Sequence, residues 1–204
     1  MERVVVLANG KFPESDVPAG YLRNADKIIC CDGAVENLVA YGLEPDAIAG
    51  DMDSISDKLK VRYSNILHPD SDENSNDLTK AVKYCISAGY TDIVILGSSG
   101  YREDHTLGNI SLLAEYSEFL AVRMVTDTGI FVPVNSGERI RSFQGQQISI
   151  FSFKEKTEIT SENLKYPLDK LVLKNLWMGT LNESISDYFC LHFVRGTIIV
   201  FLTF

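Results

Sequence analysis

The first 125 residues alternate short apolar runs with segments whose apolar residues recur at helical spacing. The runs are continuous and rich in β-branched residues, which is typical of strands buried on both faces of a sheet. Strands that alternate with helices favour a parallel sheet, because each parallel connection needs a crossover. The expected strands are residues 4–8, 27–31, 65–68 and 92–96, and the expected helices are residues 34–41, 56–63, 76–88 and 104–119.

After about residue 125 the pattern changes to short β-like runs separated by turns that contain Gly or Asn. This pattern is typical of a small all-β sandwich. We therefore predict an α/β domain with a Rossmann-like parallel sheet over residues 1–127, followed by a smaller all-β sandwich domain over residues 128–204. The expected strands of the second domain are residues 130–134, 139–143, 147–153, 170–173, 188–194 and 197–204.

The chain is acidic, with 28 Asp and Glu residues against 19 Lys and Arg residues and a formal net charge of −9. Such a protein has no long-range attraction for nucleic acid or for an anionic membrane surface, so neither is expected as a partner. The charge does not exclude a small anionic ligand, because a bound divalent cation can reverse the sign of a site. No apolar stretch approaches the ~20 residues of a membrane-spanning helix.

The four cysteines, Cys30, Cys31, Cys85 and Cys190, include no pair at C-x-x-C spacing. They are expected to be buried thiols rather than metal ligands. The apolar run at residues 4–8 is too short for the core of a signal peptide. Reduced thiols without a signal peptide indicate a cytoplasmic protein.

Acidic residues follow the ends of expected strands, where ligands bind in open parallel sheets. The first two motifs are Cys31-Asp32-Gly33-Ala34 and Gly50-Asp51-Met52-Asp53-Ser54. An Asp-x-Asp motif can bring two carboxylates to one cation, and such oxygen ligands suit Mg²⁺. The alternative is a turn in which Asp51 or Ser54 caps the helix at residues 56–63.

A third acidic segment lies directly before the helix expected at residues 76–88. It contains Asp72, Glu73 and Asp77, three acids within six residues. Acids are favoured at a helix N-terminus by capping and by the helix dipole. Capping accounts for one or two of these residues, and Asp77 is also a candidate site residue.

A glycine-rich turn follows the strand at residues 92–96, with the sequence Gly97-Ser98-Ser99-Gly100-Tyr101-Arg102-Glu103-Asp104-His105 and Asn109 further on. Such a turn before a helix presents backbone N–H groups to an anion such as phosphate, and Arg102 could hold the phosphate in a bidentate manner. The turn lacks the Gly-Lys-Ser/Thr of a Walker A loop. The alternative is a tight turn with a capped helix, in which His105 is structural.

The combination of carboxylates, an arginine and glycine-rich backbone at strand ends is what Mg²⁺-assisted phosphoryl or diphosphoryl transfer requires. The order of these motifs, beginning with Asn9-Gly10, resembles the thiamine pyrophosphokinase (thiamin diphosphokinase) family. The segment Thr160-Ser161-Glu162-Asn163-Leu164-Lys165-Tyr166-Pro167-Leu168 is similar to a segment of that family's second domain.

The resemblance implies a Mg²⁺-dependent enzyme that transfers the diphosphoryl group of ATP to the hydroxyl of thiamine and releases AMP. It also implies a homodimer, with an ATP- and Mg-binding catalytic domain and a thiamine-binding, dimerising sandwich. By motif, the metal ligands are Asp51, Asp53 and Asp77, and the catalytic residues are Asp53, Asp77, Arg102 and Asp104. The substrate-binding residues implied are Asn9, Asp32, Gly33, Gly50, Ser54, Glu73, Gly97, Gly100, His105, Asn109, Thr180 and Asn182.

Two positions depart from the family pattern. Glu73-Asn74 stands where the family often has Gln-Asp or Lys-Asp, and Leu181-Asn182 stands where it has Ser-Asn. Trp177 is expected in the core, although it could also stack on a heteroaromatic cation. Phe151, Phe153, Phe189 and Phe193 are likewise expected in the sandwich core, with a dimer contact as the alternative.

Two other functions remain open at this stage. One keeps the site and changes the acceptor, giving a Mg²⁺-dependent pyrophosphokinase or phosphohydrolase that acts on another substrate. The other is a non-catalytic nucleotide- or thiamine-binding module. The retained aspartates favour the enzyme, because binding alone does not need so many acids beside a phosphate.

Overall fold

The computed structural model describes residues 2–153 and 156–204. The chain divides after Asp127 into two compact units, Met1–Asp127 and Thr128–Phe204. The first unit is α/β and the second contains antiparallel β-sheets, so the predicted fold class is confirmed.

The first unit is built on a parallel sheet with the strand order β6-β5-β1-β2-β3-β4. β1 lies in the middle and pairs with β2 on one side and with β5 on the other. Its four residues are all buried, as a continuous apolar run predicts. The strands are β1 (Val4–Leu7), β2 (Lys27–Cys31), β3 (Ala47–Gly50), β4 (Leu67–Pro69), β5 (Asp92–Leu96) and β6 (Ala121–Val125).

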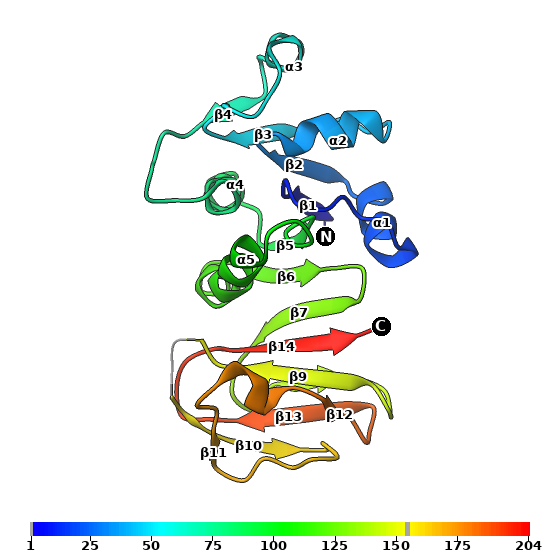
Figure 1. Cartoon of the computed structure of the whole chain (residues 1–204), viewed down its shortest axis with the longest axis vertical. Coiled ribbons are helices and arrows are strands. Elements are labelled where there is room, and N and C mark those ends of the chain that lie inside the picture. The colour runs from blue at the N-terminus through cyan, green and yellow to red at the C-terminus, as the bar shows by residue number, and fades with distance from the viewer. Residues whose placement is uncertain (1, 154–155) are drawn as a thin grey trace. The chain divides into compact units, whose positions relative to one another are not determined.

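Five helices connect these strands in the described part of the first unit. The right-handed crossover rule places the connections among β1 to β4 on one face of the sheet and the connections to β5 and β6 on the other. In Figure 1, α4 and α5 accordingly lie together, away from α1 and α2. The helices are α1 (Asp16–Arg23), α2 (Ala34–Ala40), α3 (Asp57–Arg62), α4 (Asp77–Ser87) and α5 (Glu103–Tyr116).

Local sequence accounts for the limits of α4. Asn76 is its N-cap, and the side-chain oxygen of Asn76 accepts a hydrogen bond of 2.9 Å from the backbone N–H of Thr79. Gly89 follows the helix with a φ of +83°, a conformation that favours glycine. The buried residues Leu78, Ala81 and Cys85 form the face that packs on the sheet.

Three elements of the first unit, α1, β3 and β6, are absent from the expected set. The start of α1 is fixed from far away in the chain, because the Asp127 carboxylate accepts hydrogen bonds from the N–H groups of Glu14 and Ser15 at 3.1 and 2.9 Å. No local motif reveals such a long-range contact.

The second unit consists of two antiparallel sheets. One contains the strands β12-β9-β14-β7 and the other has the order β11-β10-β13-β8. Among the described residues of this unit, the one helical element is the 3₁₀ turn η1 (Leu176–Gly179), which lies between β11 and β12. The strands are β7 (Gly129–Val134), β8 (Arg139–Arg141), β9 (Gln147–Phe151), β10 (Glu158–Glu162), β11 (Leu171–Val172), β12 (Asn182–Glu183), β13 (Tyr188–His192) and β14 (Ile198–Thr203).

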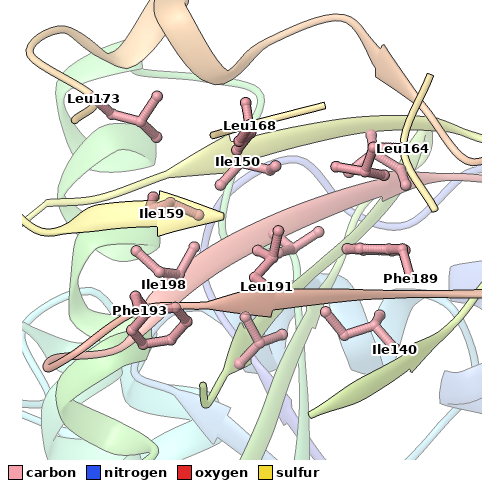
Figure 2. Packing of buried hydrophobic residues seen from close by; sticks show 13 residues of the cluster. Ile140, Ile150, Ile159, Leu164, Leu168, Leu173, Phe189, Leu191, Phe193 and Ile198 are labelled. Carbon is pink, nitrogen blue, oxygen red and sulfur yellow. The ribbon is translucent and has the colours of Figure 1, made fainter. Parts of the chain in front are cut away.

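A core of aliphatic residues around Phe189 fills the second unit (Figure 2). Phe189 and Phe193 belong to this core, as expected. The same expectation is wrong for Phe151 and Phe153, which are only partly buried and lie outside the cluster. Neighbouring residues of a strand point to opposite faces of the sheet. Because Ile150 of β9 points into the core, the next residue, Phe151, points away from the core.

All four cysteines are buried and free, as predicted. Burial disfavours the thiolate and raises the pKa of Cys85 to about 12, so this thiol is unreactive at neutral pH. Among the described residues, no helix is long and apolar enough to cross a membrane.

The substitution Phe189→Ala should strongly destabilise the chain. The side chain is 0% exposed, and its removal leaves a cavity that costs about 3–5 kcal/mol of unfolding free energy. Urea denaturation followed by circular dichroism measures the change. Phe143→Ala is the control, because Phe143 is 52% exposed and its loss should change stability by less than about 0.5 kcal/mol. Equal losses in the two variants would contradict the assigned core.

Candidate active site

The candidate site lies where the carboxyl ends of β1, β2, β3 and β5 meet at one edge of the parallel sheet. The chain runs outward from β1 to β4 and then returns to β5 on the other side of β1, so the strand order reverses between β1 and β5. Ligands of open α/β sheets bind at such a reversal.

Backbone hydrogen bonds join the two loops at this reversal. The N–H of Gly10 donates to the carbonyl of Gly97 at 2.7 Å, and the N–H of Lys11 donates to the carbonyl of Ser99 at 2.8 Å. Gly97 has a φ of +64°, and a Cβ there would lie 2.6 Å from the carbonyl oxygen of Ala8. Only glycine suits this position, because a side chain would separate the loops.

A pocket of about 450 Å³ opens beside these loops. Its lining comes from the loops that follow β1, β3 and β5, from the last residue of β2, and from α4 and α5 with the residues just before each helix. Of the residues expected from the sequence, its lining includes Asn9, Asp51, Ser54, Asp77, Gly97, Arg102, His105 and Asn109.

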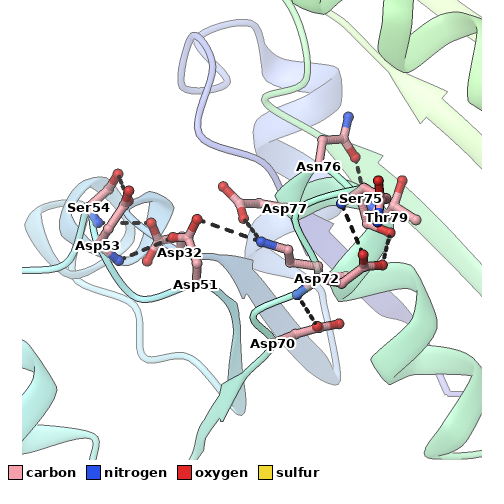
Figure 3. A network of polar contacts seen from close by, with 12 residues as sticks. Asp32, Asp51, Asp53, Ser54, Asp70, Asp72, Ser75, Asn76, Asp77 and Thr79 are labelled. Carbon is pink, nitrogen blue, oxygen red and sulfur yellow. Dashed lines mark hydrogen bonds and ion pairs between the residues drawn. The ribbon is translucent and has the colours of Figure 1, made fainter.

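Three carboxylates gather at this edge of the sheet. One ligand atom each of Asp32, Asp51 and Asp53 lies within 4.8 Å of the others. The sequence named Asp51, Asp53 and Asp77 as metal ligands, whereas the structure groups Asp32 with the Asp-x-Asp pair. Asp51 and Asp77 extend toward each other from separate elements (Figure 3).

The backbone around the carboxylates is tightly constrained. Asp32 has a φ of +35° directly after β2, and Met52 has a φ of +68° between the two aspartates of the motif. A Cβ at Gly50 would lie 2.8 Å from the Cβ of Asp32, so only glycine lets the ends of β2 and β3 approach so closely. The N–H of Ser54 donates to the Asp32 carboxylate at 3.0 Å and holds the two segments together.

The environments of Asp32 and Asp53 shift their pKa values in opposite directions. Burial raises the pKa of Asp32, whose side chain is 1% exposed. A hydrogen bond of 2.8 Å from the Ser54 hydroxyl lowers the pKa of Asp53. The Oδ1 atom of Asp32 is buried and has no hydrogen-bond partner among the described residues. A buried carboxylate oxygen without a partner, beside two further carboxylates, fits a cation.

A buried lysine connects the carboxylates. Lys80 lies on α4, is 6% exposed and lines the pocket. Its ammonium group is 3.3 Å from Oδ1 of Asp77 and 3.6 Å from Oδ2 of Asp51. The sequence analysis gave this lysine no role. Its spacing of three residues from Asp77, on the helix face that also buries Ala81, is the signal that could have identified it.

Asparagine side chains fix the start of α4 against the glycine-rich turn. The Asn76 amide donates to Oδ1 of Asn109 at 3.1 Å, and the Asn109 amide donates to the carbonyl of Ser98 at 3.0 Å. Asn109 therefore holds the turn in place from a buried position on α5. The Ser98 hydroxyl is buried and also has no hydrogen-bond partner in the described part of the chain.

Arg102 and Asp104 form an exposed pair at the start of α5. Nε of Arg102 donates to Oδ1 of Asp104 at 3.1 Å, and the N–H of His105 donates to the same oxygen at 2.9 Å. The hydrogen bond from Arg102 contributes most to holding the pKa of Asp104 at about 2. An exposed guanidinium whose partner is a surface carboxylate can exchange that partner for a ligand phosphate.

Seven of the predicted site residues of the first unit lie outside the pocket lining, namely Asp32, Gly33, Gly50, Asp53, Glu73, Gly100 and Asp104. Gly33 is the buried N-cap residue of α2, Gly100 ends the glycine-rich turn with a φ of +98°, and Glu73 is exposed in the turn before α4.

The predicted residues of the second unit already have hydrogen bonds within that unit. The Asn182 amide donates to the carbonyl of Tyr166 at 2.8 Å, and the Thr180 hydroxyl donates to the carbonyl of Trp177 at 2.7 Å. The expectation that Trp177 lies in the core is wrong, because its side chain is 72% exposed. It belongs to the short turn η1, which cannot bury an indole that points outward.

A parallel α/β unit with carboxylates and a glycine-rich turn at its topological switch point is typical of proteins that bind phosphate groups together with a cation. Comparison with known proteins narrows this class. The family profile described as "Thiamin pyrophosphokinase, catalytic domain" matches residues 19–125, and the profile "Thiamin pyrophosphokinase, substrate-binding domain" matches residues 129–201. The chain therefore belongs to the thiamin pyrophosphokinase family, as its motifs indicated.

Individual relatives agree with the profiles. Thiamine pyrophosphokinase 1 of Oryza sativa subsp. japonica is 31% identical over 141 residues, which span 62% of this chain and 53% of that protein. Thiamine pyrophosphokinase of Bacillus subtilis is 27% identical over 214 residues, which span 98% of each chain. A crystal structure of thiamine pyrophosphokinase from Bacillus subtilis superimposes with a TM-score of 0.81 at 24% identity and covers 99% of both chains, so the fold is shared.

The substitution Arg102→Ala should raise the pKa of Asp104 from about 2 toward the ordinary value of ~3.9. The positive guanidinium favours the ionised carboxylate, so its loss makes protonation easier. The rise should be partial, because the hydrogen bond from His105 remains. NMR titration of the carboxyl carbons measures the pKa. Asp26, which Arg3 holds at a pKa of about 2, is the internal control. An unchanged Asp104 pKa would contradict the pairing.

Proposed function

We propose that this protein is a thiamine pyrophosphokinase, which transfers the diphosphoryl group of ATP to the hydroxyl of thiamine and gives thiamine diphosphate and AMP. The observation that carries the proposal is the match of both domain profiles of that family, in order, over residues 19–125 and 129–201. The pocket at the strand reversal supports it, because carboxylates, a lysine and glycine-rich backbone converge there.

Mg²⁺ is the proposed cofactor, with Asp51, Asp53 and Asp77 as its proposed ligands and Asp32 as a further candidate ligand. The unpartnered Oδ1 atom of Asp32 and the close approach of the three carboxylates support this assignment. When bound, the ion offsets the repulsion between the carboxylates and the phosphates and stabilises the charge that develops during transfer.

The glycine-rich turn after β5 is the proposed phosphate site. Its backbone and the start of α5 offer N–H groups to an anion, and Ser98 offers a buried hydroxyl. Arg102 is proposed to leave Asp104 and contact a phosphate, where a guanidinium can form paired hydrogen bonds. Asn9 and His105, which line the same pocket, are proposed to contact the nucleotide or the acceptor.

In the proposed reaction, the thiamine hydroxyl oxygen bonds to the β-phosphorus of ATP. The bond between that phosphorus and the oxygen bridging to the α-phosphorus breaks, and AMP leaves with the bridging oxygen. The hydroxyl proton passes to a carboxylate of the site, and Asp104, freed from Arg102, is a candidate acceptor.

The two units are proposed to have different functions. Residues 1–127 form the catalytic domain that binds ATP and Mg²⁺, and residues 128–204 form the domain that binds thiamine and dimerises. Thr180 and Asn182 are the proposed thiamine-side residues of the second unit. Leu181, which replaces the serine of the family pattern, is 75% exposed with a φ of +61° and is accessible to a ligand. We further propose a cytoplasmic homodimer.

The decisive experiment is identification of the products. Purified full-length protein with thiamine, ATP and Mg²⁺ should give AMP and thiamine diphosphate in equal amounts, measured by chromatography. Omission of thiamine, or chelation of the metal, should abolish both products. Inorganic phosphate without a diphosphate ester would instead indicate a phosphohydrolase and would overturn the proposal. Formation of ADP would exclude diphosphoryl transfer.

The substitution Asp53→Asn should lower kcat by a hundredfold or more, because it removes a proposed ligand of the metal. The metal stabilises the charge of the transition state by several kcal/mol, which corresponds to a factor of that size. The fold should survive, since Asp53 is exposed. The assay is AMP release at saturating substrates, with circular dichroism as the folding check. Asp57→Asn is the matched control, because Asp57 lies on α3, outside both the pocket lining and the cluster of Asp32, Asp51 and Asp53, and should leave kcat unchanged. A normal kcat in Asp53→Asn would remove Asp53 from the metal site.

A further inference from the structure

The ammonium group of Lys80 is unusually placed for a lysine. Its side chain is 5% exposed, while the side chains of its two carboxylate partners, Asp51 and Asp77, are 43% and 39% exposed. Water can therefore solvate the carboxylates without help from the lysine. Burial of the Lys80 ammonium group is itself unfavourable. Because Asp51 and Asp77 are not buried, a need to neutralise buried acids does not explain why Lys80 pairs with them.

Lys83, one helical turn further along α4, provides a contrast. Its ammonium group pairs with Asp72 at 3.1 Å and its side chain is 51% exposed, which is ordinary for a surface ion pair. Lys80 differs from Lys83 in its burial and in its partners, because both partners of Lys80 line the pocket and are proposed metal ligands.

Asp51 belongs to two groups at once. It contributes an oxygen to the cluster with Asp32 and Asp53, and its Oδ2 atom lies 3.6 Å from the ammonium group of Lys80. A divalent ion at Asp51 would thus have a fixed positive charge as its neighbour. Two positive charges near the same carboxylate repel each other, and the repulsion is stronger away from bulk water. Lys80 cannot relieve it by turning into solvent, since its side chain is enclosed.

A polyphosphate would offset the repulsion between the Lys80 ammonium group and the divalent ion. Its negative charges attract both cations, so the ammonium group and the divalent ion can occupy the pocket together once the phosphates are present. Lys80 lines the same pocket as the glycine-rich turn and Arg102, which places it within the region assigned to the phosphates.

We propose that Lys80 is a positioning residue that holds Asp51 and Asp77 while the pocket lacks a nucleotide, so that the divalent ion binds together with the polyphosphate rather than before it. The inference rests on the proposed function for the identity of the polyphosphate. It concerns the order of binding, and therefore it can be tested without turnover.

The test is a titration of the full-length protein with Mn²⁺, in which electron paramagnetic resonance measures the free ion. Without nucleotide, Lys80→Met should bind Mn²⁺ about tenfold more tightly than the wild type, because a nearby positive charge is lost. Lys80→Gln should behave in the same way. With a non-hydrolysable ATP analogue present, the gain in Mn²⁺ affinity caused by the analogue should be smaller in both variants than in the wild type.

Lys83→Met is the matched control and should leave both affinities unchanged, since the ammonium group of Lys83 contacts Asp72 and the Ser75 hydroxyl but none of the proposed metal ligands. Thermal unfolding checks that each variant is folded. Unchanged or weaker Mn²⁺ binding in the Lys80 variants would overturn the proposal, and so would a failure of both variants to fold, which would make Lys80 a structural residue. Tighter Mn²⁺ binding in a protein that makes no thiamine diphosphate would refute the proposed function and leave the role of Lys80 standing.

Discussion

The parallel pairing of β1 with both β2 and β5 is the constraint on which the rest of the site depends. It brings the ends of strands from distant parts of the sequence to one edge of the sheet. The hydrogen bonds from Gly10 to Gly97 and from Lys11 to Ser99 then fix the two central loops as one surface. Around that surface lie the carboxylates, the glycine-rich turn and the start of α4. The positions of the functional side chains therefore follow from the geometry of the backbone.

The sequence predicted the fold class and the family because both depend on local or ordered signals. Continuous apolar runs such as residues 92–96 indicate buried parallel strands, and Gly89 marks the end of α4. The order of short motifs identifies the family even though each motif is weak alone. What these signals share is that each can be recognised within a few residues.

The structure added features that depend on contacts between distant residues. Asp127 holds the two residues before α1 by hydrogen bonds that join positions 113 and 112 residues apart in the sequence. Asp32 joins the Asp-x-Asp carboxylates because Gly50 allows the ends of β2 and β3 to approach. The burial of Lys80 and the exposure of Trp177 are likewise set by tertiary packing. The general tendency of tryptophan to be buried gave the wrong expectation for Trp177.

The exposure of Trp177 gives the protein a natural optical reporter. The chain contains one tryptophan, so its indole fluorescence arises from a single position. Because that indole is 72% exposed, the emission of the free chain should be that of a water-surrounded ring. Any molecule that covers η1 would shift the emission to shorter wavelength, whether it is a small ligand or a second copy of the chain. Events at this part of the second unit can therefore be followed without a label.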